Sequence, residues 1–224
     1  MLITKNSNII IFILFILTAI AFAISARYFS KKQKIIRTLS NLPIQEIGKF
    51  KNNTLTHYSG KAFEIHEPLI APFSEKKCVF YQLKIEQLDK SLKNSKWKTV
   101  KKEEKAQDFL LEDNGNFAFI KPKDYISYVV TNKKVVFDAL NKATPKLQNL
   151  LKRYEIENIN WNSRKPLRFS ESIIEVGQQL SVAGIANWTS LDFPIKHYSY
   201  SKIIKLSSTK SQKLIISNLP NNKK

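Results

Sequence analysis

An uncharged stretch of 18 residues near the start of the chain, Ile9 to Ala26 (IIIFILFILTAIAFAISA), constrains the fold more than any other feature. Only Thr18 and Ser25 in it are polar. As a helix it would be about 27 Å long, close to the thickness of the hydrocarbon core of a bilayer. The stretch therefore predicts a single transmembrane helix at residues 9–26, after an N-terminal tail at residues 1–8.

A cleaved signal peptide is the alternative interpretation of this stretch. Lys5 precedes it, and small residues at Ala19, Ala21 and Ala23 resemble a signal-peptidase site. An uncleaved anchor is favoured because the apolar run is longer than the roughly 7 to 15 residues typical of signal peptides. Cleavage would imply secretion, and an anchor can also hold the chain on the outer side of the membrane.

A basic segment follows the apolar stretch directly and has no acidic residue between residues 27 and 42. It can continue as a helix from Arg27 to Ser40, and Leu42-Pro43 stops it, because the residue before a proline is disfavoured in a helix. The positive-inside rule predicts that the chain after the span lies in the cytoplasm. We expect the basic side chains of this juxtamembrane segment to contact the membrane surface: Arg27, Lys31, Lys32, Lys34 and Arg37.

The formal net charge of the 224-residue chain is +19, and much of it lies near the C-terminus. Basic charge of this density predicts anionic lipid head groups as a possible partner. A compositional bias toward Lys, Asn and Ile, with no ligand at all, explains the charge equally well. Nucleic acid is not expected, because no groove-reading helix or stacking strand pattern stands out. From residue 193 on, including a basic tail at 218–224, the basic residues are Lys196, Lys202, Lys205, Lys210, Lys213, Lys223 and Lys224.

The remaining residues, 43–217, predict one α+β domain that is mostly antiparallel β with one packed helix. Thr144 is a suitable N-cap before Pro145, and the apolar residues from Leu147 to Tyr154 recur with helical spacing. The charged region between Leu88 and Gln107 is interpreted as a connection in which Trp97 is the main contact. Runs rich in β-branched and aromatic residues predict strands at 60–66, 77–88, 124–130, 133–137, 179–188, 198–206 and 213–217.

The segment FLLEDNGNFAFIKPKD raises the question of a catalytic carboxylate pair at Glu112 and Asp113. Neighbouring residues of a strand point to opposite faces, so the two carboxylates are poorly placed to act together. Asn-Gly between apolar runs instead predicts a hairpin. A two-residue loop would pair Leu111 with Ala118, whereas a three-residue loop would pair it with Phe117. We expect the Asp113 carboxylate to accept a hydrogen bond from a downstream backbone amide.

Other catalytic and metal-binding motifs are missing from the sequence. The three histidines (His57, His66 and His197) belong to no nucleophile or zinc motif, and the five glycines form no phosphate loop. Cys78 is the only cysteine, which excludes an intrachain disulfide, and its apolar surroundings favour a small buried hydrophobe. We therefore predict no catalytic residues, no metal site and no cofactor.

The order of several segments between residues 43 and 217 resembles the GIDE domain, also called the beside-a-membrane domain. These segments are LPIQEIGKF, YSGKAFEIHEPLIAPFSEKKCVFYQLKIEQ, FLLEDNGNFAFIKP, RFSESIIEVGQQLSVAGIA and KLIIS. The module occurs in membrane-anchored RING-type E3 ubiquitin ligases of mitochondria and in many bacterial membrane proteins. We expect the positions that match its pattern to be structural: Gly60, Pro72, Cys78, Tyr81, Phe109, Asp113, Gly115, Pro122, Glu171, Gly177 and Gly184.

The resemblance implies ubiquitin transfer, but the zinc ligands of a RING are missing. One cysteine and three histidines are too few to build that domain. Ubiquitin-protein transferase activity would therefore need a RING from another chain. We expect instead a single-pass membrane protein whose β-rich domain is a non-catalytic interaction or scaffold module. Its partners would be the bilayer, through residues 9–26, and a protein that the sequence does not identify; binding of anionic lipid or nucleic acid through the basic surface is a third interpretation.

Overall fold

A computed structural model describes residues 2–89, 95–137, 144–156, 165–191, 194 and 201–219, with side chains described from residue 12 onward. Its contacts divide the chain into two units, Met1–Pro43 and Ile44–Lys224. The boundary coincides with the Leu42-Pro43 step, where the backbone of Leu42 is extended (φ −104°, ψ 117°). This conformation is the one that a following proline favours.

The first unit consists of two helices, α1 (Leu2–Tyr28) and α2 (Lys31–Asn41). The helix predicted for residues 9–26 thus begins earlier, at Leu2. The juxtamembrane segment is not its continuation, because the Ser30 hydroxyl accepts a hydrogen bond from the Gln33 amide and caps a new helix. Among the described residues no single helix is long and apolar enough to cross a bilayer; α1 from Phe12 and α2 meet the criteria of length and composition only when taken together, as a pair bent by 58°. The single transmembrane helix stays a prediction.

The centre of the second unit is a closed barrel of five strands. Strand β1 pairs antiparallel with β5 and β10, β5 with β6, and β10 with β11, while β6 and β11 run parallel. If the five strands are numbered 1 to 5 along the chain, their order around the barrel is 1-2-3-5-4, and strand 4 pairs with strand 1 to close it. This order is the topology of the OB fold, a small Greek-key barrel. The barrel strands are β1 (Thr54–Glu64), β5 (Phe109–Asp113), β6 (Asn116–Lys121), β10 (Gln179–Ser190) and β11 (Lys202–Ser207).

Two further strands, β7 (Tyr125–Tyr128) and β12 (Leu214–Ser217), extend the barrel sheet beyond β10. Strand β12 pairs antiparallel with β10 and parallel with β7. The domain is therefore mostly antiparallel, as predicted, with parallel pairs at β6–β11 and β7–β12. Inward side chains such as Tyr58, Phe109 and Val182 are fully buried and form the core of the barrel.

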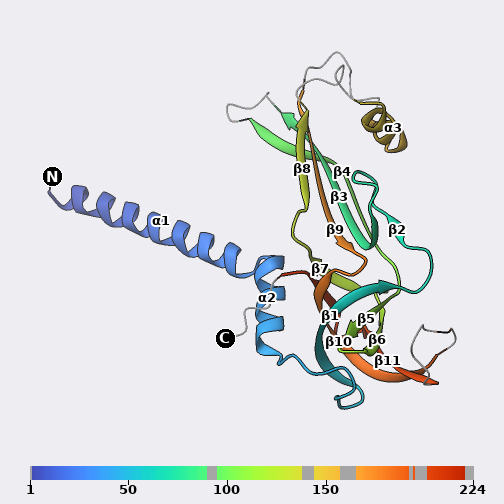
Figure 1. The fold of residues 1–224 in the computed structure, drawn as a ribbon. Helices are drawn as coiled ribbons and strands as arrows, with labels where there is room; N and C mark the ends of the chain where they lie inside the picture. The colour runs from blue at the N-terminus through green and yellow to red at the C-terminus, as the bar shows by residue number, and fades with distance from the viewer. Residues whose placement is uncertain are drawn as a thin grey trace. The chain divides into compact units, whose positions relative to one another are not determined.

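A second sheet is inserted into the barrel at two places (Figure 1). One insertion lies between β1 and β5 and the other between β6 and β10, and both leave from the same end of the barrel, where Glu64 pairs with Phe109 and Phe109 with Ile120. The inserted strands are β2 (Leu69–Ile70), β3 (Lys77–Asp89), β4 (Lys96–Ala106), β8 (Lys133–Phe137) and β9 (Leu167–Glu175). Strand β3 pairs with β2, β4 and β9, and β9 pairs with β8.

Helix α3 (Pro145–Arg153) covers one face of this second sheet, and it confirms the predicted helix. The Thr144 hydroxyl accepts a hydrogen bond from the Leu147 amide, and Pro145 is in the first turn. The predicted apolar face, Leu147 to Tyr154, packs with sheet residues such as Leu83 and Phe169. This packing supplies most of the stability of such a short helix, because isolated helices of this length are marginal in water.

The interpretation of residues 88–107 as a connection is wrong. Most of that region is β4, a strand at the edge of the sheet whose exposed side chains are mainly lysines. Charged edge strands are tolerated because one side of the ladder faces solvent. Trp97 does make the predicted contact, since the Arg168 guanidinium lies 4.4 Å from the centre of its ring. The strand β9 was not predicted from the sequence. Of the strand predicted at 198–206, the structure shows the part from Lys202 on as β11, and residues 195–200 lie outside the described ranges.

The predicted hairpin is confirmed with a two-residue loop, in which Leu111 pairs with Ala118. Asn114 and Gly115 have φ angles of 51° and 80°, as a type I′ turn requires. The expected role of Asp113 is wrong: the Glu112 carboxylate, at 2.8 Å, accepts the hydrogen bond from the Gly115 amide. Asp113 instead accepts one from the Asn114 side chain at 3.2 Å. The acidic pair belongs to a turn.

Candidate functional site: the mouth of the barrel

The residues that match the GIDE pattern occupy positions that shape the backbone or the core, spread over both sheets. Gly115 and Gly177 have positive φ angles, and Gly60 and Gly184 lie where a Cβ atom would meet a neighbouring strand. The Glu171 carboxylate is buried. Of the other positions, Pro72 lies in the turn between β2 and β3 and Asp113 ends β5, while the buried ones are Cys78, Tyr81, Phe109 and Pro122.

The residues predicted to contact the membrane surface lie at the end of α1 and along α2. Arg27 is in the last turn of α1. The Arg37 side chain is held within the unit, because its guanidinium lies 3.7 Å from the centre of the Tyr28 ring and donates a 3.0 Å hydrogen bond to the Tyr28 carbonyl. Arg37 therefore braces the break between the helices. The remaining members, in the first half of α2, are Lys31, Lys32 and Lys34.

One compact group of titratable side chains is a carboxylate held by two phenols. The hydroxyls of Tyr81 and Tyr154 both donate hydrogen bonds to the Glu103 carboxylate. Burial acts to raise the pKa of Glu103, but these hydrogen bonds hold it below its ordinary value. Burial and the same carboxylate raise the pKa of both tyrosines. All three groups therefore keep one protonation state near neutral pH, and the cluster attaches α3 to the sheet instead of transferring protons.

Metal chemistry finds no site in the described ranges, where no group of three or more His, Cys, Asp or Glu side chains could hold an ion. The single thiol, Cys78, likewise belongs to no group of described side chains that could hold a metal ion. Cys78 is fully buried on β3, and its thiol donates a long contact of 3.6 Å to the Leu69 carbonyl.

We predict that Cys78 is unreactive while the protein is folded. Burial, together with the charges of Glu171 and Glu175, raises the pKa of the thiol from 9.0 to about 12. Because the thiolate is the nucleophile, DTNB should label the folded chain at pH 8 at least ~100-fold more slowly than the chain unfolded in guanidinium. The difference should shrink only as the pH approaches 12. Rapid stoichiometric labelling of the folded chain at pH 8 would contradict this.

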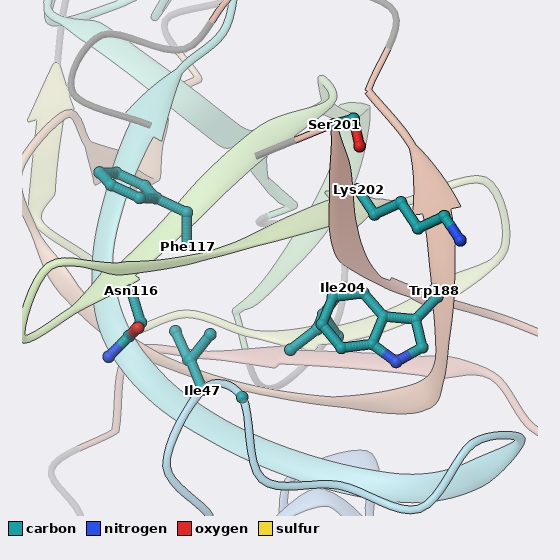
Figure 2. A pocket seen from close by; sticks show the side chains of 8 residues that line it. Ile47, Asn116, Phe117, Trp188, Ser201, Lys202 and Ile204 are labelled. Atoms are coloured by element: carbon teal, nitrogen blue, oxygen red, sulfur yellow. The ribbon is translucent and has the colours of Figure 1, made fainter. Parts of the chain in front are cut away.

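A pocket of 510 Å³ opens at the end of the barrel opposite to the inserted sheet. Trp188 and Ile204, which are paired across β10 and β11, form one wall, and Ile47 closes the pocket from the segment before β1 (Figure 2). The hairpin between β5 and β6 supplies the opposite wall. The full lining is Ile47, Gly48, Asn116, Phe117, Trp188, Ser201, Lys202 and Ile204.

The pocket owes its shape to the divergence of two parallel strands. The ladder between β6 and β11 begins at Ala118 and Ile204. Continued backward in the same register, it would pair Asn116 with Lys202, but both residues line the pocket instead. A volume of this size lies within the range of ligand sites in proteins, roughly 300 to 1,000 Å³.

Trp188 gives the pocket an exposed aromatic face. Its side chain is 52% exposed although it lies two residues beyond the buried Ala186 on the inward side of β10. The ring of Phe50 supports it, with a centroid separation of 5.3 Å. Trp188 was not predicted as a site residue from the sequence. The feature that could have identified it is its position: it continues the every-second-residue pattern of inward side chains on this strand, beyond the last buried one.

The fold and the pocket define a β-barrel protein of OB topology with an inserted sheet and a pocket with several apolar lining residues at one end of its barrel. No protein-family model, curated protein or solved structure matches the chain.

Proposed function

We propose that this chain is a single-pass membrane protein whose barrel domain is a non-catalytic interaction module at the membrane surface. The observation that carries the proposal is the surface of α1. From Phe12 to Ile24 its large apolar side chains are between 41% and 78% exposed. Soluble proteins rarely leave a continuous apolar surface of this kind in water.

Two features of the second unit support an interaction module. Two of its carboxylates, Glu103 and Glu171, are engaged in structural hydrogen bonds. Its pocket combines an exposed tryptophan with few polar groups, as ligand pockets in proteins commonly do. The GIDE resemblance fits a domain beside a membrane, and ubiquitin transfer would still need a RING from another chain.

Deletion of residues 1–26 is expected to release the protein from membranes. In cells, full-length protein should remain in the membrane pellet after alkaline carbonate washing, because burial of about 18 apolar residues in lipid is effectively irreversible. The deletion variant should appear in the supernatant.

Two control variants show whether membrane retention is caused by insertion of the apolar segment or by the basic charges that follow it. Replacing residues 9–26 with a polyleucine segment of equal length should restore pelleting. Replacing Arg27, Lys31, Lys32, Lys34 and Arg37 with glutamine should leave the protein in the pellet, because a surface charge effect is weaker than insertion. A deletion variant that still resists carbonate washing would refute membrane anchoring by this segment.

A further inference from the structure

The face of the inserted sheet that points away from α3 carries a row of lysines. Leu83 of β3 packs beneath α3, so its neighbour Lys84 points to the other face. The register places Lys102 of β4 opposite Lys84. On the other side of Lys84 the row continues with Ser170 of β9 and ends with Lys134 of β8. The three lysines, which we call the lysine row, therefore cross the four strands that lie side by side in Figure 1.

Two members of the lysine row have no acidic partner. Lys84 is bonded to Glu86 on the same strand. The side chains of Lys102 and Lys134 are exposed, and neither is within ion-pair distance of an acidic group in the part of the chain that the structure describes. Lys102 and Lys84 are also directly opposite each other, an arrangement in which like charges destabilise a sheet. A bound anion would offset this repulsion, so the lysine row favours an anionic ligand.

Among the described residues of this face, the unpaired positive charge is confined to the lysine row. On one side of the row Glu104 lies next to Lys102. On the other side the cation is Arg168, whose guanidinium is paired with the Glu86 carboxylate at 2.7 Å. A membrane surface or a nucleic-acid duplex would lie across the whole face and would meet Glu104 as well as the lysines. A single narrow chain along the row would meet the lysines alone.

The length of the lysine row matches a short extended polypeptide. Neighbouring strands lie about 4.8 Å apart, so the row spans about 14 Å from β4 to β8. In an extended chain every second side chain points to the same side, and three such positions also span about 14 Å. Three acidic residues at alternate positions can therefore each reach one lysine.

A single strand of nucleic acid is the other narrow polyanion, and this face suits it less well. Strand binding depends on aromatic rings on which the bases stack. Trp97 is the aromatic residue of β4, and the Arg168 guanidinium already lies over its ring, 4.4 Å from the centre. An acidic polypeptide needs no such ring.

We infer that the lysine row binds an acidic segment of a partner polypeptide, which lies extended across the strands with carboxylates at alternate positions. This partner is one that the proposed interaction module would hold, so its assignment rests on the proposed function. Ion pairs at an exposed surface are individually weak and are screened by salt, so we expect a low affinity that falls as the ionic strength rises.

The test is a titration of the dansylated peptide Glu-Ala-Glu-Ala-Glu, amidated at its C-terminus, with the full chain in a non-ionic detergent at low salt. Binding is followed by the fluorescence anisotropy of the dansyl group. The double variant Lys102→Gln/Lys134→Gln should bind the peptide about tenfold more weakly than the unaltered protein. The same peptide with glutamine in place of glutamate should not bind measurably.

The matched control is the double variant Lys61→Gln/Lys123→Gln, which removes the same charge from exposed positions outside the inserted sheet. It should weaken binding by less than about twofold, because those lysines are distant from the row and screened. The comparison separates the lysine row from the general attraction of a chain whose formal net charge is +19. Since all four side chains are exposed, both double variants should fold, and circular dichroism checks this.

Equal weakening by the two double variants would overturn the inference, because net charge alone would then explain the binding. Undiminished binding by Lys102→Gln/Lys134→Gln, or equal binding of the glutamine peptide, would also overturn it. If that variant lost affinity for decathymidylate or for vesicles containing phosphatidylserine but not for the acidic peptide, the ligand would be a nucleic acid or a membrane. Because the titration is done in detergent, its failure is distinguishable from failure of the carbonate-wash experiment, which tests membrane anchoring alone.

Discussion

Replacing Gly60 with alanine is expected to lower the free energy of unfolding by about 3 kcal/mol or more. A Cβ atom at this position would lie 2.4 Å from the Glu112 carbonyl oxygen and 3.1 Å from Cγ of Leu111. The nearest atom belongs to the backbone of β5, so it cannot move away as the end of a flexible side chain would. Relief of the clash would require β1 and β5 to separate.

The position of Gly60 in the barrel explains why the clash cannot be absorbed. Strand β1 pairs with β10 from Thr54 to Lys61 and with β5 from Lys61 to Glu64, so its ladder changes partner next to Gly60. Separation of β1 from β5 would open the barrel. Thermal unfolding of the full chain in detergent, followed by circular dichroism, measures the effect.

Gly115→Ala is the matched control, because it adds the same methyl group to the β5–β6 hairpin, three residues after the Glu112 carbonyl that Gly60 approaches. No atom lies within 4 Å of a Cβ there, so the cost should be only that of the positive φ angle of 80°, about 1 kcal/mol. If Gly60→Ala were no less stable than Gly115→Ala, the close approach of β1 and β5 would not be a determinant of stability.

Local chemistry made parts of this fold predictable from sequence. The Asn114-Gly115 turn and the Thr144-Pro145 helix start depend on the backbone preferences of neighbouring residues, and the structure has both where the sequence predicts them. Even there one detail was predicted wrongly, because the carboxylate that accepts the hydrogen bond from the Gly115 amide is that of Glu112 and not that of Asp113. Either side chain can accept a hydrogen bond from a turn amide, so the local sequence did not distinguish them.

Elements that depend on distant partners were harder to predict. Strand β4 has only Trp97 and Val100 as large apolar residues, because as an edge strand it needs pairing with β3 more than burial. Closure of the barrel depends on β1 meeting β10, more than 100 residues later in the chain. No local pattern reports such a pairing.

The pocket was unpredictable for the same reason. Its walls come from the segment before β1, the β5–β6 hairpin, the end of β10 and the start of β11, which meet only when the barrel closes. Apart from Trp188, each of its residues is ordinary in its own segment. Sequence alone could identify Trp188 as unusual, whereas its proximity to Lys202 and Asn116 is a property of the topology.

Glu171→Ala is the second substitution for which we expect a large loss of stability, about 3 kcal/mol. The carboxylate is 1% exposed and accepts hydrogen bonds from the backbone amides of Phe73 and Ser74, at 2.7 and 2.9 Å. Alanine would leave both amides without this acceptor. The turn they belong to also places the Phe73 ring in a stack with Phe169, at a centroid separation of 5.5 Å, so loss of the anchor would loosen the core beneath α3.

Two further substitutions separate this anchoring from a general effect of charge. Glu171→Gln keeps one acceptor oxygen and should lose about half as much stability as alanine. Glu175→Ala removes an acidic residue four positions later whose bond to Lys76, at 2.7 Å, is exposed to solvent, and should cost less than about 1 kcal/mol. Thermal unfolding of the three variants in detergent should therefore rank them, from most to least stable, as Glu175→Ala, Glu171→Gln and Glu171→Ala. Equal stability of the two alanine variants would show that the turn does not depend on Glu171, and Phe73 would then have to be held by its ring contacts alone.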